Sequence, residues 1–415
     1  MVSRRGLFGA AAATALAGAA GTALAASPAS ELKPMTGDAK AIQPEERLAR
    51  LAKAQKLMRD QGIGAIVLEP GSAMDYFTGV LWHTSERTTA AVIPANGEVV
   101  IVTPHFEEPS VRETLGVPGE IRIWHEHESP FLRISQALAD RGVTSGKVGV
   151  EANVRFFVID GLRTASNGAY EIVSANPVTR PCRMIKSAAE IALMQKATDV
   201  TMAAYAYVYP RVKVGMAPHE IMEMMNGATA ALGGAPEFSL VLLNEASAYP
   251  HGSRQPQLVR EGSVVLMDCG CTVHGYQSDI SRTWVMGTPT PRQRKVWETV
   301  KRGQEITLET ARLGVQAQEI DKAVRAFYER EGWGPGYKLP GLSHRVGHGI
   351  GLDGHEAAYF VGGDATPLQA GMCFSDEPGI YIPGEFGIRL EDCLHMTEQG
   401  PKLFSGLAKS LEAPI

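Results

Sequence analysis

The sequence predicts two domains, an α/β domain over residues 43–182 followed by an α+β domain over residues 183–410. The chain has 415 residues, of which 44% are hydrophobic and 20% are charged, and this is enough material for two globular cores. In the first part, short apolar runs alternate with helical stretches, as in an α/β layer. In the second part, strands and helices form separate groups rather than a strict alternation, which favours an α+β domain.

The first domain is predicted to begin with a helix. Pro44–Gln61 carries leucines and a methionine at helical spacing, and Gly62 follows as a stop signal. Short apolar and helical segments then alternate along the chain: Ala65–Leu68, Val99–Thr103, Phe131–Arg141 and Lys147–Val150.

The second domain is predicted to open with the connection Arg183–Ser187 and a long helix, Ala188–Val208. Pro218 occupies a first-turn position and starts another helix that continues to Met225. Two further helices lie between two hairpins that each carry an acidic pair: Arg292–Arg312 and Gln318–Glu331.

The first acidic hairpin carries Asp268 and Asp279. Asp268 lies in VVLMDCGC and Asp279 in YQSDISRTWVM, and the segment between these β-like runs contains His274-Gly275, which suits a tight turn. The two aspartates are symmetric about the gap between residues 273 and 274. Folding at that gap is predicted to place them opposite each other or nearly so.

The second acidic hairpin carries Glu377 and Glu391, which are symmetric about Gly384 in the turn-like Pro383-Gly384-Glu385. Like charges on facing strands lie about 4.5–5.5 Å apart at Cβ and repel each other unless something neutralises them. Solvated hairpin charge would explain one such pair. Two pairs together with the imidazole of His348 favour a site for two divalent ions and a bridging water.

The histidine segment is predicted to be a strand and a turn. His344 and His348 are four residues apart, which on a helix would resemble a zinc-binding pair. Gly347, Gly349 and Gly351 argue against a helix, because each costs about 1 kcal/mol relative to alanine. We expect the glycines to let the backbone approach the metals.

These segments carry a family resemblance. The two aspartates, HRVGHGIGLDGHE, FSDEPGIYIPG and GIRLED resemble the creatinase/prolidase/methionine aminopeptidase family of dinuclear metallopeptidases over about residues 185–400. The upstream domain resembles that of the aminopeptidase P, prolidase and creatinase branch. The resemblance implies an α+β pita-bread catalytic domain preceded by a creatinase-like N-terminal α/β domain. Creatinase itself lacks the full metal set that this chain keeps.

The resemblance implies a role for each candidate ligand. Asp268 would be a bidentate ligand of one ion, Asp279 and Glu391 would bridge, and His348 and Glu377 would complete the shell of the other ion. Oxygen-rich donors with one imidazole favour Mn²⁺, with Fe²⁺, Co²⁺ or Zn²⁺ as alternatives. Two such ions can activate a shared water and polarise a carbonyl, and Glu377 would shuttle the proton.

The same resemblance places other residues beside the substrate. His355 would hydrogen-bond the substrate carbonyl, and His251 would be a second substrate-facing histidine, the alternative being a structural loop histidine. His344 would line the leaving-group side. Arg389 lies two residues before Glu391 and would orient carboxylates, the alternative being a surface ion pair. Asp376 departs from the family pattern and is predicted to point away from the metals.

The implied reaction is hydrolysis of Xaa-Pro bonds by a metal-bridging hydroxide, in an aminopeptidase or a dipeptidase. Two alternatives remain: a hydrolase or lyase of the same fold acting on a non-peptide small molecule, and an inactive peptide-binding module. The net charge of −5 without a basic stripe disfavours nucleic acid as a partner. Family relatives suggest a homodimer in which the Trp82-His83 loop reaches the neighbouring active site, the alternative being a packed aromatic.

The first residues resemble an export signal. A twin-arginine pair, Arg4-Arg5, precedes an Ala/Gly-rich run that ends at Ala23-Leu24-Ala25, so residues 1–25 are predicted to be a twin-arginine-type signal and residues 26–42 a tether. This predicts a periplasmic or secreted protein that is exported folded. A membrane anchor is the disfavoured alternative, because alanine and glycine insert poorly.

Two smaller groups are predicted to be structural. The five cysteines are odd in number and lack CxxC spacing, which favours small buried hydrophobes, and Cys269 should face away from Asp268. His125 and His127 alternate with glutamate on an edge strand and are predicted to be solvated, the alternative being a small metal cluster.

Overall fold

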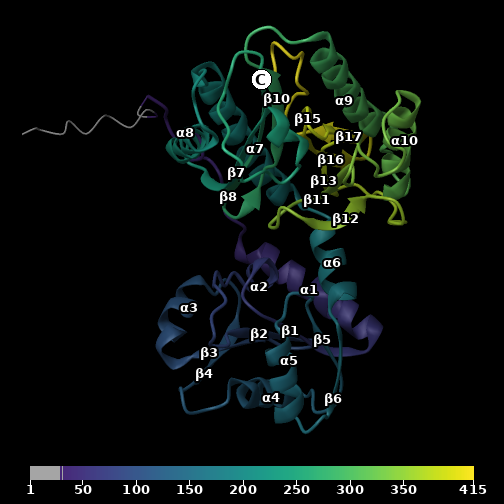
Figure 1. Cartoon of the computed structure of the whole chain (residues 1–415). Helices are drawn as coiled ribbons and strands as arrows, with labels where there is room; N and C mark the ends of the chain where they lie inside the picture. Colours follow the sequence, from purple (N-terminus) through teal and green to yellow (C-terminus); the bar gives the residue numbers. More distant parts are fainter. Residues whose placement is uncertain (1–28, 30) are drawn as a thin grey trace, which may run out of the picture.

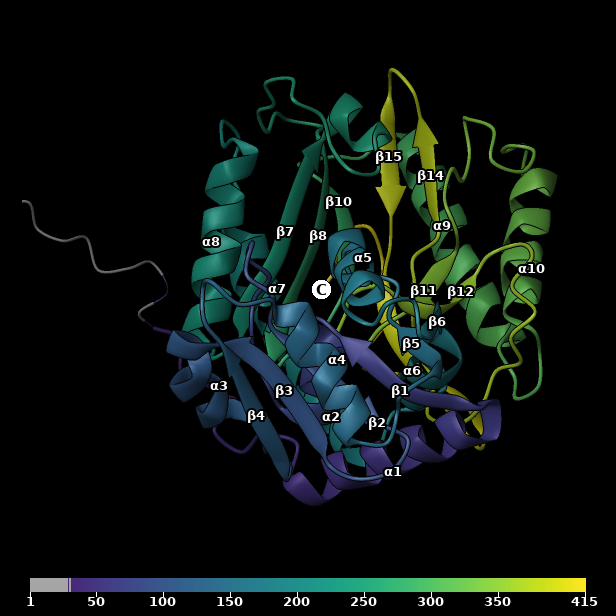
Figure 2. The same cartoon turned by 90° about the horizontal axis from the view of Figure 1, so that it is seen from below.

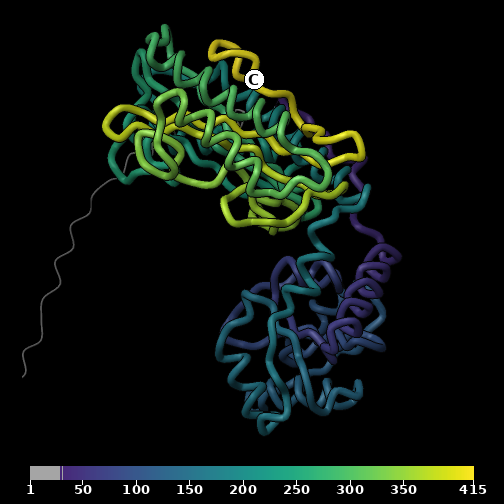
Figure 3. The backbone as a smooth tube through the Cα atoms, turned by 90° about the vertical axis from the view of Figure 1, so that its right-hand side faces the viewer, coloured from purple at the N-terminus to yellow at the C-terminus, as the bar shows by residue number. Residues whose placement is uncertain are grey.

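The computed structural model describes residues 29 and 31–415. The predicted export signal and the first residues of the predicted tether lie outside them. The described chain forms two lobes, and the N-terminal domain lies below the C-terminal domain in Figures 1 and 3. Within this part of the chain, no helix has the length and apolar character needed to cross a membrane.

The N-terminal domain is built on one mixed six-stranded sheet. The strand order is β4-β3-β2-β1-β5-β6, with β1 antiparallel to β2 and parallel to β5. The strands are β1 (Ile63–Leu68), β2 (Ala90–Pro94), β3 (Val99–Pro104), β4 (Gly119–Trp124), β5 (Gly146–Val150) and β6 (Tyr170–Ser174). The helices are α1 (Pro44–Gln61), α2 (Ser72–Thr78), η1 (His105–Glu107), α3 (Glu108–Thr114), α4 (Pro130–Asp140), α5 (Phe156–Ala165) and α6 (Asn176–Met184).

Alternation along β1 gives this sheet two buried faces. Ile66 and Leu68 join the core that contains α1, whereas Ala65 and Val67 join the core that contains α4. The predicted helix Pro44–Gln61 is confirmed, and it ends at Gly62 with a left-handed φ of +67°. The α/β layer predicted for this part of the chain is therefore present.

The C-terminal domain has two groups of strands. One sheet has the order β10-β8-β7, and a second has the order β12-β11-β13-β16-β17, beside the hairpin β14-β15. Figure 2 shows α7 and α8 beside the first group and α9 and α10 beside the second. The first group comprises α7 (Ala188–Val208), η2 (Tyr209–Arg211), α8 (Pro218–Ala231), β7 (Ala235–Leu243), η3 (Asn244–Ala248), β8 (Val264–Val273), β9 (Tyr276–Gln277) and β10 (Ile280–Val285). The second comprises α9 (Pro291–Thr310), α10 (Ala317–Arg330), β11 (Gly347–Gly349), β12 (Glu356–Phe360), β13 (Cys373–Asp376), β14 (Gly379–Ile382), β15 (Phe386–Arg389), β16 (Asp392–Thr397) and β17 (Gly400–Leu403).

The helices of this domain begin where the sequence signals predict. Ser187 and Glu190 form a reciprocal capping box at the start of α7, and the predicted span of that helix is confirmed. Helix α8 begins at Pro218 but continues to Ala231, beyond the predicted end at Met225. Its extra turn is alanine-rich, and Ala228 extends the buried face, which favours continuation of the helix.

The predicted tether is corrected over residues 31–42, which pack against the C-terminal domain. The backbone N–H of Met35 donates to the carbonyl of Leu232 over 2.9 Å, and Glu31 forms an ion pair with Arg211 at 2.6 Å. Apolar side chains at intervals along this stretch contact the core, namely Leu32, Met35, Ala39 and Ile42. Their spacing lets one side of the segment bury itself, and a free tether would leave these groups in water.

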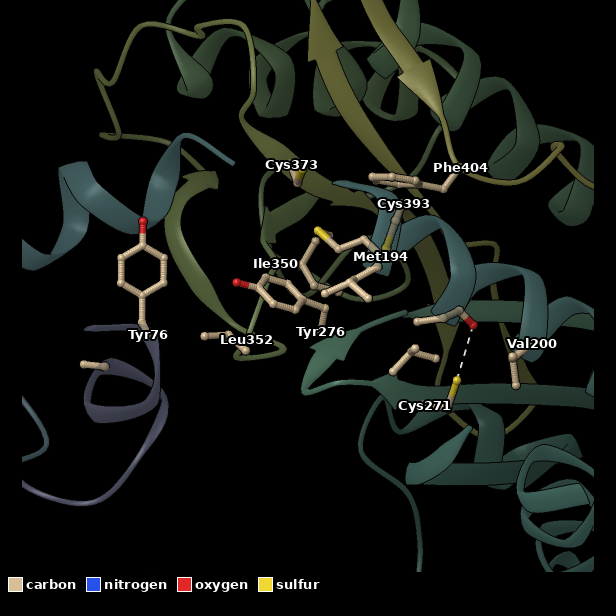
Figure 4. Packing of buried hydrophobic residues seen from close by; sticks show 14 of the residues in the cluster. Tyr76, Met194, Val200, Cys271, Tyr276, Ile350, Leu352, Cys373, Cys393 and Phe404 are labelled. Carbon is tan, nitrogen blue, oxygen red and sulfur yellow. Dashed lines mark hydrogen bonds between the residues drawn. The ribbon is translucent and has the colours of Figure 1, made fainter. Parts of the chain in front are cut away.

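The two domains share one buried core. Tyr76 from α2 belongs to the same cluster as Tyr276 and Leu352 of the C-terminal domain (Figure 4). At the junction, Arg50 donates to the Tyr276 hydroxyl over 3.0 Å, and that hydroxyl donates to Glu190 over 2.8 Å. This continuous packing fixes the N-terminal domain against the loops that border the candidate site.

The cysteines are buried and unpaired, as predicted. Cys269 contacts the α7 side of β8, away from the face that carries Asp268, because neighbouring residues of a strand point to opposite faces. Cys271 donates to the Ala197 carbonyl over 3.3 Å (Figure 4).

Candidate metal centre

The turn of the first acidic hairpin lies one residue further along the chain than predicted. His274 and Gly275 have φ of +48° and +83°, as a two-residue hairpin turn requires. Asp268 therefore faces Ser281 across the ladder and lies diagonally across from Asp279, which agrees with the prediction that the two aspartates lie opposite each other or nearly so. The register differs by two residues from the predicted one, and a shift of two preserves the face to which side chains point. The two aspartates remain diagonal neighbours that line the same cavity.

The second acidic hairpin has the predicted register. Gly379 pairs with Arg389 on one side, and Asp376 pairs with Asp392 on the other. These two pairs flank Glu377 and Glu391 and set them across from each other. The symmetry about Gly384, whose φ is +80°, is confirmed.

Both hairpins deliver their acids to His348. Ligand atoms of Asp279, His348 and Glu391 all lie within 4.8 Å of one another. His348 Nε2 is 3.3 Å from Glu377 Oε1 and 3.6 Å from Asp279 Oδ2. His348 Nδ1 lies 3.1 Å from the Gly349 carbonyl, which can only accept, so Nδ1 carries the hydrogen. The lone pair of Nε2 therefore faces the carboxylates, as in a metal-binding imidazole.

The electrostatics of this cluster are those of a cation site. Burial, followed by repulsion from neighbouring acids, raises the pKa of Asp279 and of Glu391 well above the usual range. Burial also raises the pKa of Glu377 to about 7 and lowers that of His348. In the described chain, Asp268 Oδ1 and Asp279 Oδ1 are buried without a hydrogen-bond partner. Such orphaned oxygens fit ligation to divalent ions.

Arg389 orients acidic side chains of this cluster through hydrogen bonds. Its Nη2 donates to Asp268 Oδ2 over 2.6 Å, and its Nε donates to Ser281 Oγ over 2.9 Å. Ser281 in turn donates to Glu391 Oε2 over 2.8 Å. One guanidinium thus positions an acid from each hairpin, which supports the predicted orienting role and leaves no surface ion pair, since Arg389 is buried.

A chain of hydrogen bonds continues from Arg389 to His344. Arg389 Nη1 donates to the Tyr381 hydroxyl over 3.1 Å, and this hydroxyl lies 2.7 Å from His344 Nε2. His344 Nδ1 lies 2.7 Å from the Arg345 carbonyl and must donate to it, so Nε2 accepts from Tyr381. Sequence reasoning missed Tyr381, although its alternation with Glu377 along the strand was a usable signal.

Gly379 makes room for this hydroxyl. A Cβ at position 379 would lie 2.6 Å from the Tyr381 hydroxyl oxygen, closer than real Cβ contacts allow. Any larger residue would displace the acceptor to which Arg389 donates.

The histidine segment is a strand, as predicted, but its glycines serve a different purpose. A Cβ at Gly347 would lie 2.1 Å from the Ser375 carbonyl oxygen of β13, and one at Gly349 would lie 2.6 Å from the Ala357 carbonyl oxygen of β12. The glycines therefore let neighbouring strands approach β11. The prediction that they let backbone approach the metals is corrected accordingly.

All the candidate site residues line one cavity of about 870 Å³. His355 packs edge to face against His348, with ring centroids 4.2 Å apart. The exposed rings of His355 and His251 make no hydrogen bond within the described residues, so their ring nitrogens are available to a ligand. Cavity-lining residues that sequence reasoning missed are Glu237, Phe238, Leu240, Gln277, Tyr337, Arg345 and Val361.

The segment that carries His355 is fixed by a second charged cluster, which we call the interdomain clamp: Ser72, Arg183, Lys186, Asp353 and Glu356. The Glu356 carboxylate accepts from Arg183 and, over 3.0 Å, from Lys186. Arg183 also donates to Asp353 over 2.7 Å, and Ser72 of the N-terminal domain hydrogen-bonds the same carboxylate. Burial would raise the pKa of Glu356, but the two cations lower it to about 2.

The remaining predicted residues lie away from the cluster. Asp376 is fully buried and opposes Asp392 on β16, and its side chain is absent from the cavity lining, so it points away from the ligands as predicted. His125 and His127 are exposed and solvated, as predicted, and their rings lie 5.9 Å apart. Trp82 stacks on exposed His83 with ring centroids 5.4 Å apart.

This fold and this cluster define a pita-bread metallopeptidase with a creatinase-type N-terminal domain. The model of metallopeptidase family M24 matches residues 192–398, and that of the creatinase/prolidase N-terminal domain matches residues 50–185. The chain belongs to metallopeptidase family M24, a metallo-exopeptidase family whose enzymes use divalent metal ions.

Three similar proteins are informative. A peptidase of Schizosaccharomyces pombe is 33% identical over 92% of this chain and 86% of its own length. The Xaa-Pro dipeptidase of Pyrococcus furiosus is 28% identical over 87% of this chain and 99% of its own. The crystal structure of dipeptidase PepE from Mycobacterium ulcerans is 31% identical, with a TM-score of 0.81 over 88% of this chain and 97% of its own. These relatives support metal-dependent peptide hydrolysis.

Proposed function

We propose that this enzyme hydrolyses Xaa-Pro peptide bonds, at the N-terminus of a peptide or in a dipeptide, with two divalent ions. The observation that carries the proposal is the convergence of both acidic hairpins on His348 in one cavity. The proposed ligands are Asp268, Asp279, His348, Glu377 and Glu391. When bound, the ions would lower the pKa of a water and polarise the scissile carbonyl.

The side chains of the protein supply the remaining steps. Glu377 would accept a proton from the attacking water and later donate it to the leaving nitrogen. Arg389 keeps Asp268 oriented throughout. Ring N–H groups of His251 and His355 are available to stabilise the substrate oxygen as it gains charge, a contribution that is often worth about 3–4 kcal/mol.

The cavity also suits proline after the scissile bond. The substrate α-amine would dock beside Asp268, which fixes the first residue. Phe238, Leu240 and Val361 give the cavity apolar lining that can accept the pyrrolidine ring. Histidine contacts need no amide N–H from the substrate, and the Xaa-Pro bond has none.

The native metal is proposed to be Mn²⁺. Four carboxylates and one imidazole form a hard, oxygen-rich donor set. Elemental analysis of purified protein should find two ions per chain. A protein that holds no stoichiometric pair would support the alternative of an inactive binding module.

The decisive experiment incubates Mn²⁺-loaded protein and its Glu377→Ala variant with Ala-Pro, Ala-Pro-Ala and Ala-Ala-Ala and detects products by mass spectrometry. Cleavage of a proline peptide by the wild type alone supports the proposal. Failure to cleave any of them, with two metals bound per chain, would overturn it and favour a non-peptide substrate.

We further propose export of the folded protein and assembly as a homodimer. Five buried, unpaired thiols suit folding before the chain enters an oxidising compartment. Replacing Arg4 and Arg5 with lysine should retain the unprocessed protein in the cytoplasm.

Light scattering tests the proposed dimer. We expect the dimer interface to bury Leu81, which is exposed beside Trp82. A monomer at micromolar concentration would contradict this proposal.

A further inference from the structure

Arg345 differs from the other arginine of the cavity in having no acidic partner. Within the described residues, its guanidinium forms no ion pair or hydrogen bond, and it lies over the Tyr359 ring, whose centre is 4.5 Å from the guanidinium carbon. Arg389, by contrast, donates to Asp268, Ser281 and Tyr381. The five N–H donors of Arg345 are therefore available to a ligand.

The free guanidinium lies within the proposed substrate cavity. Arg345 lines the same 870 Å³ cavity as Asp268 and His355. Its positive charge lowers the pKa of His355, after burial, and also that of Glu377, so it is electrostatically close to the reacting groups. Stacking on Tyr359 restrains the guanidinium plane without using any of its donors.

The cavity thus combines an acidic end with a cationic wall. A substrate that complements both has an amine at one end and a carboxylate at the other. A dipeptide has this pattern across about 7 Å of extended chain. A longer peptide has a neutral carbonyl where the dipeptide has its carboxylate, and so gains less from a guanidinium.

We propose that Arg345 anchors the free C-terminal carboxylate of the substrate, which makes the enzyme a dipeptidase. This inference rests on the hydrolase function proposed above. In this proposal Arg345 determines substrate specificity. The C-terminal carboxylate of the dipeptide would accept two parallel N–H donors from the guanidinium while the scissile bond lies at the metal centre.

The kinetic test compares Ala-Pro with its C-terminal amide, Ala-Pro-NH₂, in the wild type and in Arg345→Gln. The wild type should favour the acid, and the variant should raise KM for Ala-Pro by roughly 10- to 100-fold while leaving the amide unchanged. Arg345→Lys keeps the charge but loses the paired geometry, so it should fall between the two.

Arg180→Gln is the matched control. Arg180 lies on the smaller pocket between the domains, which shares His355 with the main cavity, so the variant removes a nearby positive charge without touching the proposed anchor. It should leave both substrates unchanged. If Arg180→Gln and Arg345→Gln raise KM for Ala-Pro equally, the increase comes from the loss of positive charge near the cavity. That result would overturn the proposal that Arg345 binds the substrate carboxylate. Equal losses for acid and amide in Arg345→Gln would do the same.

A binding measurement separates this inference from the hydrolase proposal. Calorimetry with L-proline and L-prolinamide requires no turnover. Wild-type protein should bind proline at least about tenfold more tightly than Arg345→Gln does, with no difference for prolinamide. If the wild type cleaves no proline peptide but shows this difference, only the hydrolase proposal fails. Equal proline binding by the two proteins overturns the anchor whatever the activity.

Discussion

The metal cluster and the interdomain clamp both contain buried carboxylates, and the protein treats these carboxylates in opposite ways. In the clamp, Glu356 meets Arg183 and Lys186, and its pKa falls to about 2. In the metal cluster, Asp279 and Glu391 meet further acids, and their pKa values rise well above the usual range. The clamp is neutralised from within the chain, whereas in the cluster one cation, Arg389, faces four carboxylates and leaves negative charge unmatched. Unmatched buried charge is therefore the feature that separates the candidate metal site from a structural one.

The largest effect is expected for Asp279→Asn. An amide cannot replace a bridging carboxylate, so peptide hydrolysis should fall by at least about 1,000-fold and elemental analysis should find fewer than two ions per chain. In metal-free protein the same change removes like-charge repulsion, so thermal unfolding should occur at a higher temperature than in metal-free wild type. Full metal content in the variant would remove Asp279 from the ligand set.

Glu356→Gln tests the other cluster. It leaves two buried cations without their shared partner, and breaking such a pair costs about 3–5 kcal/mol. Urea unfolding should show this loss equally with and without metal, whereas metal content should not change. A stability loss confined to the metal-loaded protein would mean that the clamp and the cluster act as one unit.

The pH dependence of stability should change sign when metal is added. Glu377 has an ordinary pKa of 4.5 and a folded-state pKa of about 7, so its contribution in metal-free protein is fully present below pH 4.5 and is lost as pH rises through 7. The loss is on the order of 3 kcal/mol. Metal-loaded protein needs deprotonated ligands, so added ions should stabilise it more as pH rises.

The measurement is urea unfolding between pH 5 and pH 8, with and without Mn²⁺. Metal-free protein should have the higher unfolding midpoint at pH 5. Parallel pH profiles in the two states would show that ions do not neutralise this cluster.

Local signals in the sequence predicted most of this arrangement. The turn at Gly384 fixed the register of the second hairpin, because strand pairing is symmetric about its turn. At the first hairpin the same reasoning predicted a strand register that differs from the observed one by two residues. The position of the turn within Thr272–Tyr276 depends on which residues take positive φ.

The clamp and Arg345 could not be predicted in this way. Arg183 and Glu356 are far apart in the sequence, and they meet because α6 packs near the start of β12. The guanidinium of Arg345 is free because no acidic side chain of the described chain pairs with it. Sequence patterns do not reveal which side chains lie beside a residue in the fold. Contacts between distant segments decide which buried charges are matched.

Asp376 offers the smallest and most selective test, because it is buried with neither an ion nor a cation. Neither carboxylate oxygen has a partner at hydrogen-bonding geometry within the described residues, and burial, followed by Asp392 and Glu377, raises its pKa well above 3.8 against the opposing effect of the Thr307 hydroxyl. Its folded-state cost therefore grows as pH rises. Asp376→Asn mimics the neutral acid, so its gain over wild type should be absent below about pH 3.8, grow as pH rises above that value, and reach at least about 1 kcal/mol at pH 8. Because the side chain points away from the ligands, the gain should be the same with and without metal. A gain that vanishes when Mn²⁺ is added would instead place Asp376 in the electrostatic balance of the metal cluster, and the contrast with the clamp would then extend one residue further along β13.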